Sequence, residues 1–214
     1  MARYAKLSAP VAIVNLGGVG NLTWVDPQQP PETAIFAFDT GPANAPLNDY
    51  MSRTLGLAYD EHGALAASGR ADCEILARVL QDEYFARGVP KSLDRDDFSY
   101  IASLVANLSA ADAAATLTAI TVSCVAAALE HMPAQPEQMW ITGGGRKNRE
   151  LMRLLQGALP LQVCDVDDMG FDGDMVEAQA FAYLAVRVAR GLPTSFRSTT
   201  GVVLPLSGGR VSPA

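Results

Sequence analysis

The chain has 214 residues, of which 49% are hydrophobic and 18% are charged, enough for one large domain or two small lobes around a core. Its formal net charge of −7 argues against a nucleic acid or an anionic membrane as partner, because both favour basic surfaces. We expect no apolar run long enough to span a bilayer. Residues 1–10 lack an apolar segment of signal-peptide length, so the expected location is the cytoplasm.

The cysteines and histidines exclude two further classes of site. Cys73, Cys124 and Cys164 are far apart in the sequence. An odd, scattered set indicates reduced, buried thiols rather than disulfides or a zinc site. The chain has two histidines, which argues against a histidine-based triad or metal centre.

The N-terminal part predicts a hairpin followed by a third strand. Apolar runs predict strands over 11–16, 22–25 and 35–38. The first two are separated by the glycine-rich residues 17–21, which predict a hairpin loop. The third run ends in Asp39, and Pro42 is expected to be the first residue of an amphipathic helix that reaches Leu55.

The middle of the chain predicts mainly helices. Residues 59–69 read as a loop, and the next helix is expected over about 72–86, with another helical stretch over 100–107. Ser109 and Asp112 have the spacing of a capping box. They predict the start of a long, alanine-rich helix that ends near residue 131.

The C-terminal part alternates strands and helices. The predicted order is a strand over 139–142, a helix around 150–155, a strand over 161–164 and a helix over 174–190. Gly191 stands in the C-cap position of the last helix. We see no internal repeat and no clear linker. Strands followed by helices and then by strand–loop–helix units predict a layered α/β domain.

Two glycine motifs are candidate ligand loops. The loop over 17–21 lies between two strands, so it is neither a dinucleotide fingerprint nor a Walker loop. Its glycines permit positive φ and a close approach of backbone N–H groups to a phosphate, although an ordinary hairpin turn is equally built from glycines. The motif over 143–145 lies between a strand and a helix. It either lets a planar group such as adenine lie on the main chain or is a simple turn.

Acidic residues are the other candidates for chemistry. Asp39 at a strand end is a general base, a ligand in a metal shell or a helix cap. Glu177 lies in the first turn of the last helix, where a solvated acid usually complements the helix dipole. An acidic cluster is either a polar loop or a contact to a hydrated metal; it comprises Asp165, Asp167, Asp168, Asp172 and Asp174.

In this order the motifs resemble those of the anhydro-N-acetylmuramic acid kinase family, which belongs to the actin-like ATPase and sugar-kinase superfamily. The resemblance runs from about Val11 to about Pro205. It is carried by residues 15–23, 38–44, 90–92, 115–119, 143–145 and 177–185. The resemblance implies an α/β, actin-like (ribonuclease H-like) fold with a mixed sheet and packed helices. It further implies that residues 1–214 form a single lobe equivalent to the C-terminal half of such a kinase, with the N-terminal lobe absent.

The resemblance also implies an activity. Family members use ATP and water to open the ring of 1,6-anhydro-N-acetylmuramic acid and form N-acetylmuramic acid 6-phosphate, a step of peptidoglycan recycling. By resemblance, Asp39 activates the water and Glu177 is a second carboxylate near the water or sugar. The expected cofactors are ATP and Mg²⁺, with no protein residue assigned to the metal. The residues expected to border the phosphates are Gly17, Gly18 and Asn21, those bordering adenosine are Gly143, Gly144 and Gly145, and those bordering the sugar are Thr40, Gly41 and Asn44.

Two departures and two alternatives accompany this interpretation. Ala43 replaces the family's usual glycine, and residues 93–96 read Leu-Asp-Arg-Asp where the family usually has Thr-Gly-Arg-Glu. A non-catalytic nucleotide- or sugar-binding remnant of the same fold is the alternative function. The possible protein partners are a separate N-terminal lobe or a second copy of the chain. Another sugar or acetate kinase of the superfamily is disfavoured, because those enzymes need no water nucleophile.

Overall fold

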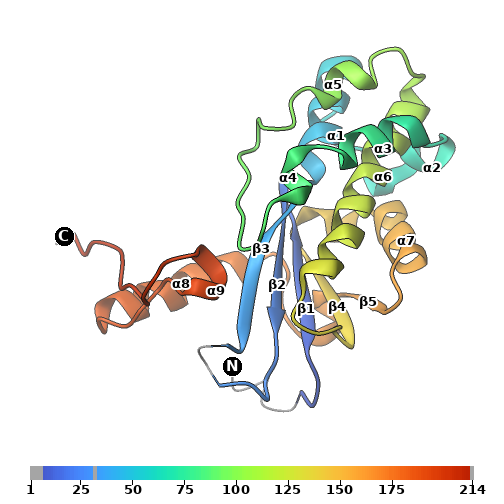
Figure 1. The fold of residues 1–214 in the computed structure, drawn as a ribbon. Coiled ribbons are helices and arrows are strands. Elements are labelled where there is room, and N and C mark those ends of the chain that lie inside the picture. The colour runs from blue at the N-terminus through green and yellow to red at the C-terminus, as the bar shows by residue number, and fades with distance from the viewer. Residues whose placement is uncertain (1–6, 31–32, 213–214) are drawn as a thin grey trace.

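A single mixed sheet organises the protein, whose computed structural model describes residues 7–30 and 33–212 (Figure 1). Within these residues the strands are β1 (Val11–Leu16), β2 (Val19–Val25), β3 (Ile35–Pro42), β4 (Gln138–Thr142) and β5 (Gln162–Asp165). Their order across the sheet is β3-β2-β1-β4-β5. β2 is antiparallel to β1 and β3, whereas β4 is parallel to β1 and β5. The predicted mixed sheet with packed helices is confirmed.

Helices follow β3, β4 and β5, whereas the described residues form no helix between β1, β2 and β3. In chain order they are α1 (Asn44–Tyr50), the π-helical η2 (Met51–Leu55), η3 (Glu61–Gly63), α2 (Ala64–Ser68), α3 (Cys73–Leu80), α4 (Glu83–Ala86), α5 (Ile101–Leu104), α6 (Ala110–Ala128), η4 (Leu129–His131), η5 (Gly144–Lys147), α7 (Arg149–Ala158), η6 (Val166–Met169), α8 (Val176–Ala189) and α9 (Arg197–Thr200). The elements η3 to η6 are single turns of 3₁₀ helix.

One face of the sheet is covered by α6 and α7, whereas the other is half-exposed at β1, β2 and β3 and buried at β4. Strand side chains alternate between faces, and in β1 the residues Ala12, Val14 and Leu16 are completely buried. They share a core with Val125 of α6 and Leu155 of α7. On the opposite face the side chains of Ile13 and Asn15 are only half-buried. This part of the face is therefore accessible.

Helix α6 is the central core helix. Its first residues are capped by Ser109, whose Oγ accepts the Asp112 N–H at 3.1 Å, as the sequence predicts. Its N-terminal half packs with α3, α4 and α5, and its C-terminal half packs on the sheet. Contrary to expectation, Ala110–His131 is long and apolar enough to span a membrane, but 67% of its most apolar window is buried. Its apolarity is therefore accounted for by its place in the core.

The end of β3 differs from the prediction. Pro42 was expected to begin a helix, but it is the last residue of β3 and pairs with Val19 of β2. Helix α1 begins at Asn44. The strand continues because β2 itself begins earlier than expected, and a proline is tolerated on an edge strand, where it gives up no ladder hydrogen bond.

Two predicted boundaries in the helical region were wrong because aspartates cap helices there. Asp60 is buried and its carboxylate accepts the N–H groups of Leu65 and Ala66, so α2 forms where a loop was expected. Asp82 accepts the Tyr84 N–H and starts α4, so the helix expected over 72–86 is broken in two. Such side-chain caps compete with a continuous helix.

The three thiols differ in exposure, whereas burial was expected for all of them. Cys73 is exposed, Cys164 is half-buried and Cys124 is buried, and all three are free thiols. Burial raises the pKa of Cys124 to about 12. The expectation fails at Cys73 because it lies on the exposed side of α3 with Ala77, whereas the core side is formed by Ile75, Leu76 and Val79.

Candidate active site

A row of polar side chains crosses the half-exposed face of the sheet. Asp39 of β3 is the register partner of Asn21 of β2, which is in turn the partner of Asn15 of β1. Asn15 is also the partner of Thr142 of β4, which is buried. Residues directly opposite each other on neighbouring strands lie on the same face. Asp39 therefore stands at the β3 end of a continuous polar row.

Asp39 is held by residues from three separate segments. Its Oδ1 accepts the side-chain amide of Asn21 and its Oδ2 accepts the Leu93 N–H, both at 2.8 Å. Its own N–H donates to the Lys91 carbonyl at 2.9 Å, and the Tyr84 hydroxyl donates to its carbonyl at 2.6 Å. A carboxylate offers about four acceptor positions. Two are used by these bonds, so the others can accept hydrogen bonds from a water.

The position of Asp39 corrects one expectation and excludes one alternative. It was expected at the end of a strand beside a helix, but β3 runs three residues further. The N-cap residue of α1 is Ala43, and no side chain caps that helix. Asp39 is therefore not a helix cap. Its place on a half-exposed face leaves the two chemical roles, base or metal-shell ligand.

Tyr84 and Lys91 form hydrogen bonds with the Asp39 backbone. Tyr84 is 1% exposed, and burial, followed by the negative charge of Asp39, raises its pKa well above the ordinary value. The hydroxyl thus remains a donor. The Lys91 ammonium lies 4.6 Å from the centre of the Tyr84 ring and donates to the Tyr84 carbonyl at 3.1 Å. These contacts connect the loop after Pro90 to β3.

The glycine hairpin is anchored to the start of α1. The Gly17 carbonyl accepts the Asn44 N–H at 2.9 Å, and the Gly18 carbonyl accepts the N–H groups of Ala43 and Ala45 at 3.1 Å. The Asn44 side-chain amide donates to the Leu16 carbonyl at 2.7 Å. The first amides of α1 are thus already occupied. A phosphate near Gly17 and Gly18 would have to contact the hairpin itself.

The triple-glycine motif lies against the end of β1. Gly143 has φ 78° and ψ −178°, a backbone region that is almost exclusive to glycine. A Cβ at Gly143 would collide with the Asn15 side chain, and one at Gly145 would collide with the Leu16 side chain. At Gly144 a Cβ would meet nothing within 4 Å. Gly143 and Gly145 are therefore packing positions, whereas Gly144 is open.

A pocket of about 390 Å³ opens beside Gly144. Asn44, Asn48, His62 and Lys147 also line it. It brings together Gly144, expected to border adenosine, and Asn44, expected to border the sugar, although these residues lie 100 positions apart in the sequence. A volume of this size is typical of a small-molecule site.

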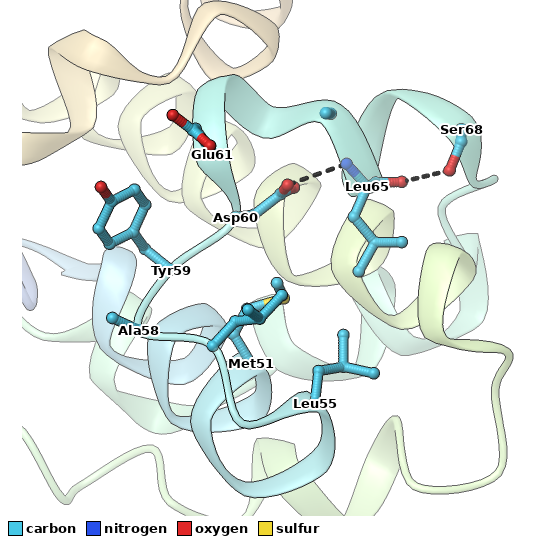
Figure 2. A pocket seen from close by; sticks show the side chains of 10 residues that line it. Met51, Leu55, Ala58, Tyr59, Asp60, Glu61, Leu65 and Ser68 are labelled. Atoms are coloured by element: carbon cyan, nitrogen blue, oxygen red, sulfur yellow. Dashed lines mark hydrogen bonds between the residues drawn. The ribbon is translucent and has the colours of Figure 1, made fainter.

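A second, larger pocket of about 640 Å³ adjoins the first and shares Tyr59, Asp60 and Glu61 with it. Figure 2 shows Met51 and Leu55 in this second pocket and the Asp60 carboxylate bonded to the Leu65 backbone. None of the residues predicted from the sequence as site residues lines it.

Three of the five aspartates in the acidic cluster form ion pairs with Arg146. The Arg146 side chain is 3% exposed and forms ion pairs with Asp165, Asp167 and Asp174 at 3.5, 3.4 and 2.8 Å. It also donates to the Gly143 carbonyl at 3.2 Å. The observation favours the structural interpretation of these aspartates, since their charge is used to hold the glycine motif next to the start of α8.

Glu177 is not brought to Asp39. It lies in the first turn of α8, is exposed, and within the described ranges has no hydrogen bond or ion pair to Asp39. Thr40 is buried, and a Cβ at Gly20 would collide with its hydroxyl. Gly41 faces Cys124 of α6. The structure thus gathers Asp39 and Asn21 in one group and Asn44 and Gly144 in another.

Comparison with known proteins decides the family. A family model described as anhydro-N-acetylmuramic acid kinase matches residues 2–214. The chain belongs to this family. Relatives named anhydro-N-acetylmuramic acid kinase are 56% identical in Roseobacter denitrificans and 58% identical in Cereibacter sphaeroides, over 99% of this chain. The chain covers 57% and 58% of those two relatives' own length.

Among solved structures the likeness is distant. The activator of 2-hydroxyisocaproyl-CoA dehydratase from Clostridium difficile, with bound ADPNP, is 14% identical with a TM-score of 0.47, over 72% of this chain and 53% of that chain. Component A of (R)-2-hydroxyglutaryl-CoA dehydratase from Acidaminococcus fermentans is 16% identical with a TM-score of 0.46, over 72% and 54%.

Family membership confirms the resemblance, while the residue roles stay predictions. In this member of the anhydro-N-acetylmuramic acid kinase family, sequence reasoning missed Tyr84, Arg146 and the row position of Asn15. The sequence did contain one signal for Arg146. This arginine directly follows the three glycines, and five aspartates that could pair with it lie between residues 165 and 174. Tyr84 offered no local signal, because its partner is 45 residues away.

We expect Arg146→Met to lower the free energy of unfolding by about 2–3 kcal/mol, because it leaves three carboxylates and the Gly143 carbonyl without their buried donor. Methionine keeps much of the aliphatic volume, so the loss reports on the charge. Urea unfolding measures it. Lys147→Met is the matched control, since Lys147 is exposed and pairs with the same Asp174 at 2.9 Å. A change of less than about 0.5 kcal/mol is expected there, and equal losses in both variants would contradict the buried role of Arg146.

Proposed function

We propose that this chain is a single lobe, equivalent to the C-terminal half, of an ATP-dependent anhydro-N-acetylmuramic acid kinase that acts in peptidoglycan recycling in the cytoplasm. The carrying observation is Asp39. Its carboxylate is fixed by Asn21 and Leu93 on an accessible face of the sheet, and it keeps free acceptor positions. A fixed carboxylate within reach of a water is suited to general-base catalysis.

The proposed chemistry assigns each bond change. Asp39 accepts a proton from a water while the water oxygen bonds to C1 of the anhydrosugar. The bond between C1 and O6 breaks, and O6 bonds to the transferred phosphoryl group. The bond between the γ-phosphorus of ATP and its bridging oxygen breaks as O6 bonds to that phosphorus, and ADP leaves. Mg²⁺ held with the nucleotide would neutralise the charge of the phosphates. The product is N-acetylmuramic acid 6-phosphate.

The residues present fit a nucleotide. The pocket beside Gly144 has the size of a small-molecule site, and the absence of a Cβ there leaves room for a flat ring on the main chain. Among the described residues no group of three or more His, Cys, Asp or Glu could hold a metal ion. Mg²⁺ would be held mainly by the phosphates of ATP, with one or two carboxylates.

The test is a coupled ADP-release assay with 1,6-anhydro-N-acetylmuramic acid and ATP-Mg. It is run on the chain alone and on the chain joined to the part of the Roseobacter denitrificans relative that it does not match. We expect sugar-dependent ADP release only from the joined form, with N-acetylmuramic acid 6-phosphate identified by mass. N-acetylglucosamine, which has no anhydro ring, is the control substrate.

Two outcomes would count against this function. ADP release that is independent of the anhydrosugar would exclude the proposed kinase. Binding of ATP or sugar by calorimetry, without turnover in the joined form, would instead identify a non-catalytic binding remnant.

A further inference from the structure

Helix α8 is apolar on all sides and buried on none. Apart from Glu177, Gln179 and Arg187, its residues are all apolar or aromatic. No residue of the helix is buried, and the exposed fractions of Phe181 and Tyr183 are 65% and 53%. Figure 1 shows α8 extending away from the sheet beyond β3. A helix that is apolar all round is normally found inside a protein core.

The exposed side chains point in opposite directions. Successive residues of a helix are rotated by roughly 100°, so Phe181 and Tyr183 lie on nearly opposite sides of α8. Leu184 and Val186, 37% and 49% exposed, fill the sides between them. One flat contact could cover only one of these sides. The helix therefore requires a surface that surrounds it.

The C-terminal tail covers little of α8. The Arg187 side chain donates to the Pro193 carbonyl and lies over the Phe196 ring, which ties the tail to the helix. Helix α9 contacts β3. Val203 and Leu204 of the tail are nevertheless 87% and 70% exposed. Helix and tail together thus form one largely exposed unit, residues 176–206, that contacts the sheet through α9.

The length of the relatives indicates what covers this unit. The chain covers 57% of the Roseobacter denitrificans relative, so 43% of that polypeptide is unmatched. We propose that the unit of residues 176–206 is the docking element for this unmatched part of the family polypeptide, which encloses α8. A second copy of the chain fits less well, because a two-fold pair of helices would cover one side of each and leave the other exposed.

Docking also bears on Glu177. Since this residue lies in the first turn of α8, the position of its carboxylate is fixed only when the helix is fixed. The inference rests on family membership and on the exposure of α8, and not on the catalytic role of Asp39. The two proposals can therefore fail separately.

Hydrogen exchange tests the proposal on the chain alone and on the chain joined to the unmatched part of the relative. We expect the amides of α8 to exchange at least 100-fold more slowly in the joined form, while those of α7 stay unchanged. In the joined form Phe181→Asp should remove most of this protection. Leu57→Asp should not, because Leu57 is also an exposed apolar residue (53%, against 65% for Phe181) but lines the larger pocket.

Two results would overturn the inference. One is unchanged exchange of α8 in a joined form whose α7 is protected and whose added part shows protected amides of its own. The other is protection of α8 in the chain alone that rises with protein concentration, which would assign this surface to a second copy. Both readouts are independent of kinase turnover.

Discussion

Replacing Asp39 with Asn is expected to lower kcat of the joined kinase by a factor of about 100 to 10,000, the usual contribution of a general base. The amide cannot accept the proton of the attacking water. KM for the anhydrosugar should change much less, because the side chain keeps its size and place. Initial rates from the ADP-release assay, over a range of sugar concentrations, separate the two constants.

The same variant has a predictable side effect on stability. An asparagine side chain has one accepting oxygen, so it cannot accept both the Asn21 amide and the Leu93 N–H as Asp39 does. We expect a loss of about 1 kcal/mol in the free energy of unfolding, too small to unfold the domain.

Asp26→Asn is the matched control for the Asp39 substitution. Asp26 directly follows β2, at the opposite end of that strand from Asn21, and its carboxylate accepts the Gln28 N–H. An asparagine can do the same, so kcat should stay within about twofold. An unchanged kcat in Asp39→Asn would remove the residue from the proposed mechanism.

Gly143→Ala is expected to lower the free energy of unfolding by about 2–4 kcal/mol. The backbone at Gly143 lies in a region that strains any other residue by about 1–3 kcal/mol, and the new methyl group would collide with the Asn15 side chain and the Leu16 backbone. Displacement of Asn15 also disturbs the polar row that ends in Asp39. Urea unfolding monitored by circular dichroism measures the change.

The neighbouring Gly144→Ala separates packing from binding. A Cβ at Gly144 meets nothing within 4 Å, so stability should change by less than about 0.5 kcal/mol. The methyl group lies in the pocket of about 390 Å³, however, and we expect it to weaken ATP binding, measured by calorimetry. Equal stability losses in the two variants would show that the glycines have no distinct roles.

Local sequence patterns predicted most of the sheet. The runs at 11–16, 35–38 and 139–142 are apolar because each strand is buried on at least one face, and such burial leaves a signal in consecutive residues. Boundaries failed where a distant strand or a side-chain cap decided them. Pro42 stayed in β3 because β2 pairs with it, and Asp82 divided a helix by capping its second half.

The sequence by itself determined the family and the strands, and it singled out Asp39 as the main candidate catalytic residue. Only the tertiary structure decided what surrounds that residue. Leu93 and Tyr84 reach Asp39 across 54 and 45 positions of the chain, and no local pattern encodes a contact over that distance. The structure likewise decided that three aspartates of the acidic cluster pair with Arg146 and that no residue of α8 is buried. The physical reason is common to these cases: periodicity records whether a side chain is buried, whereas packing decides which partner it meets.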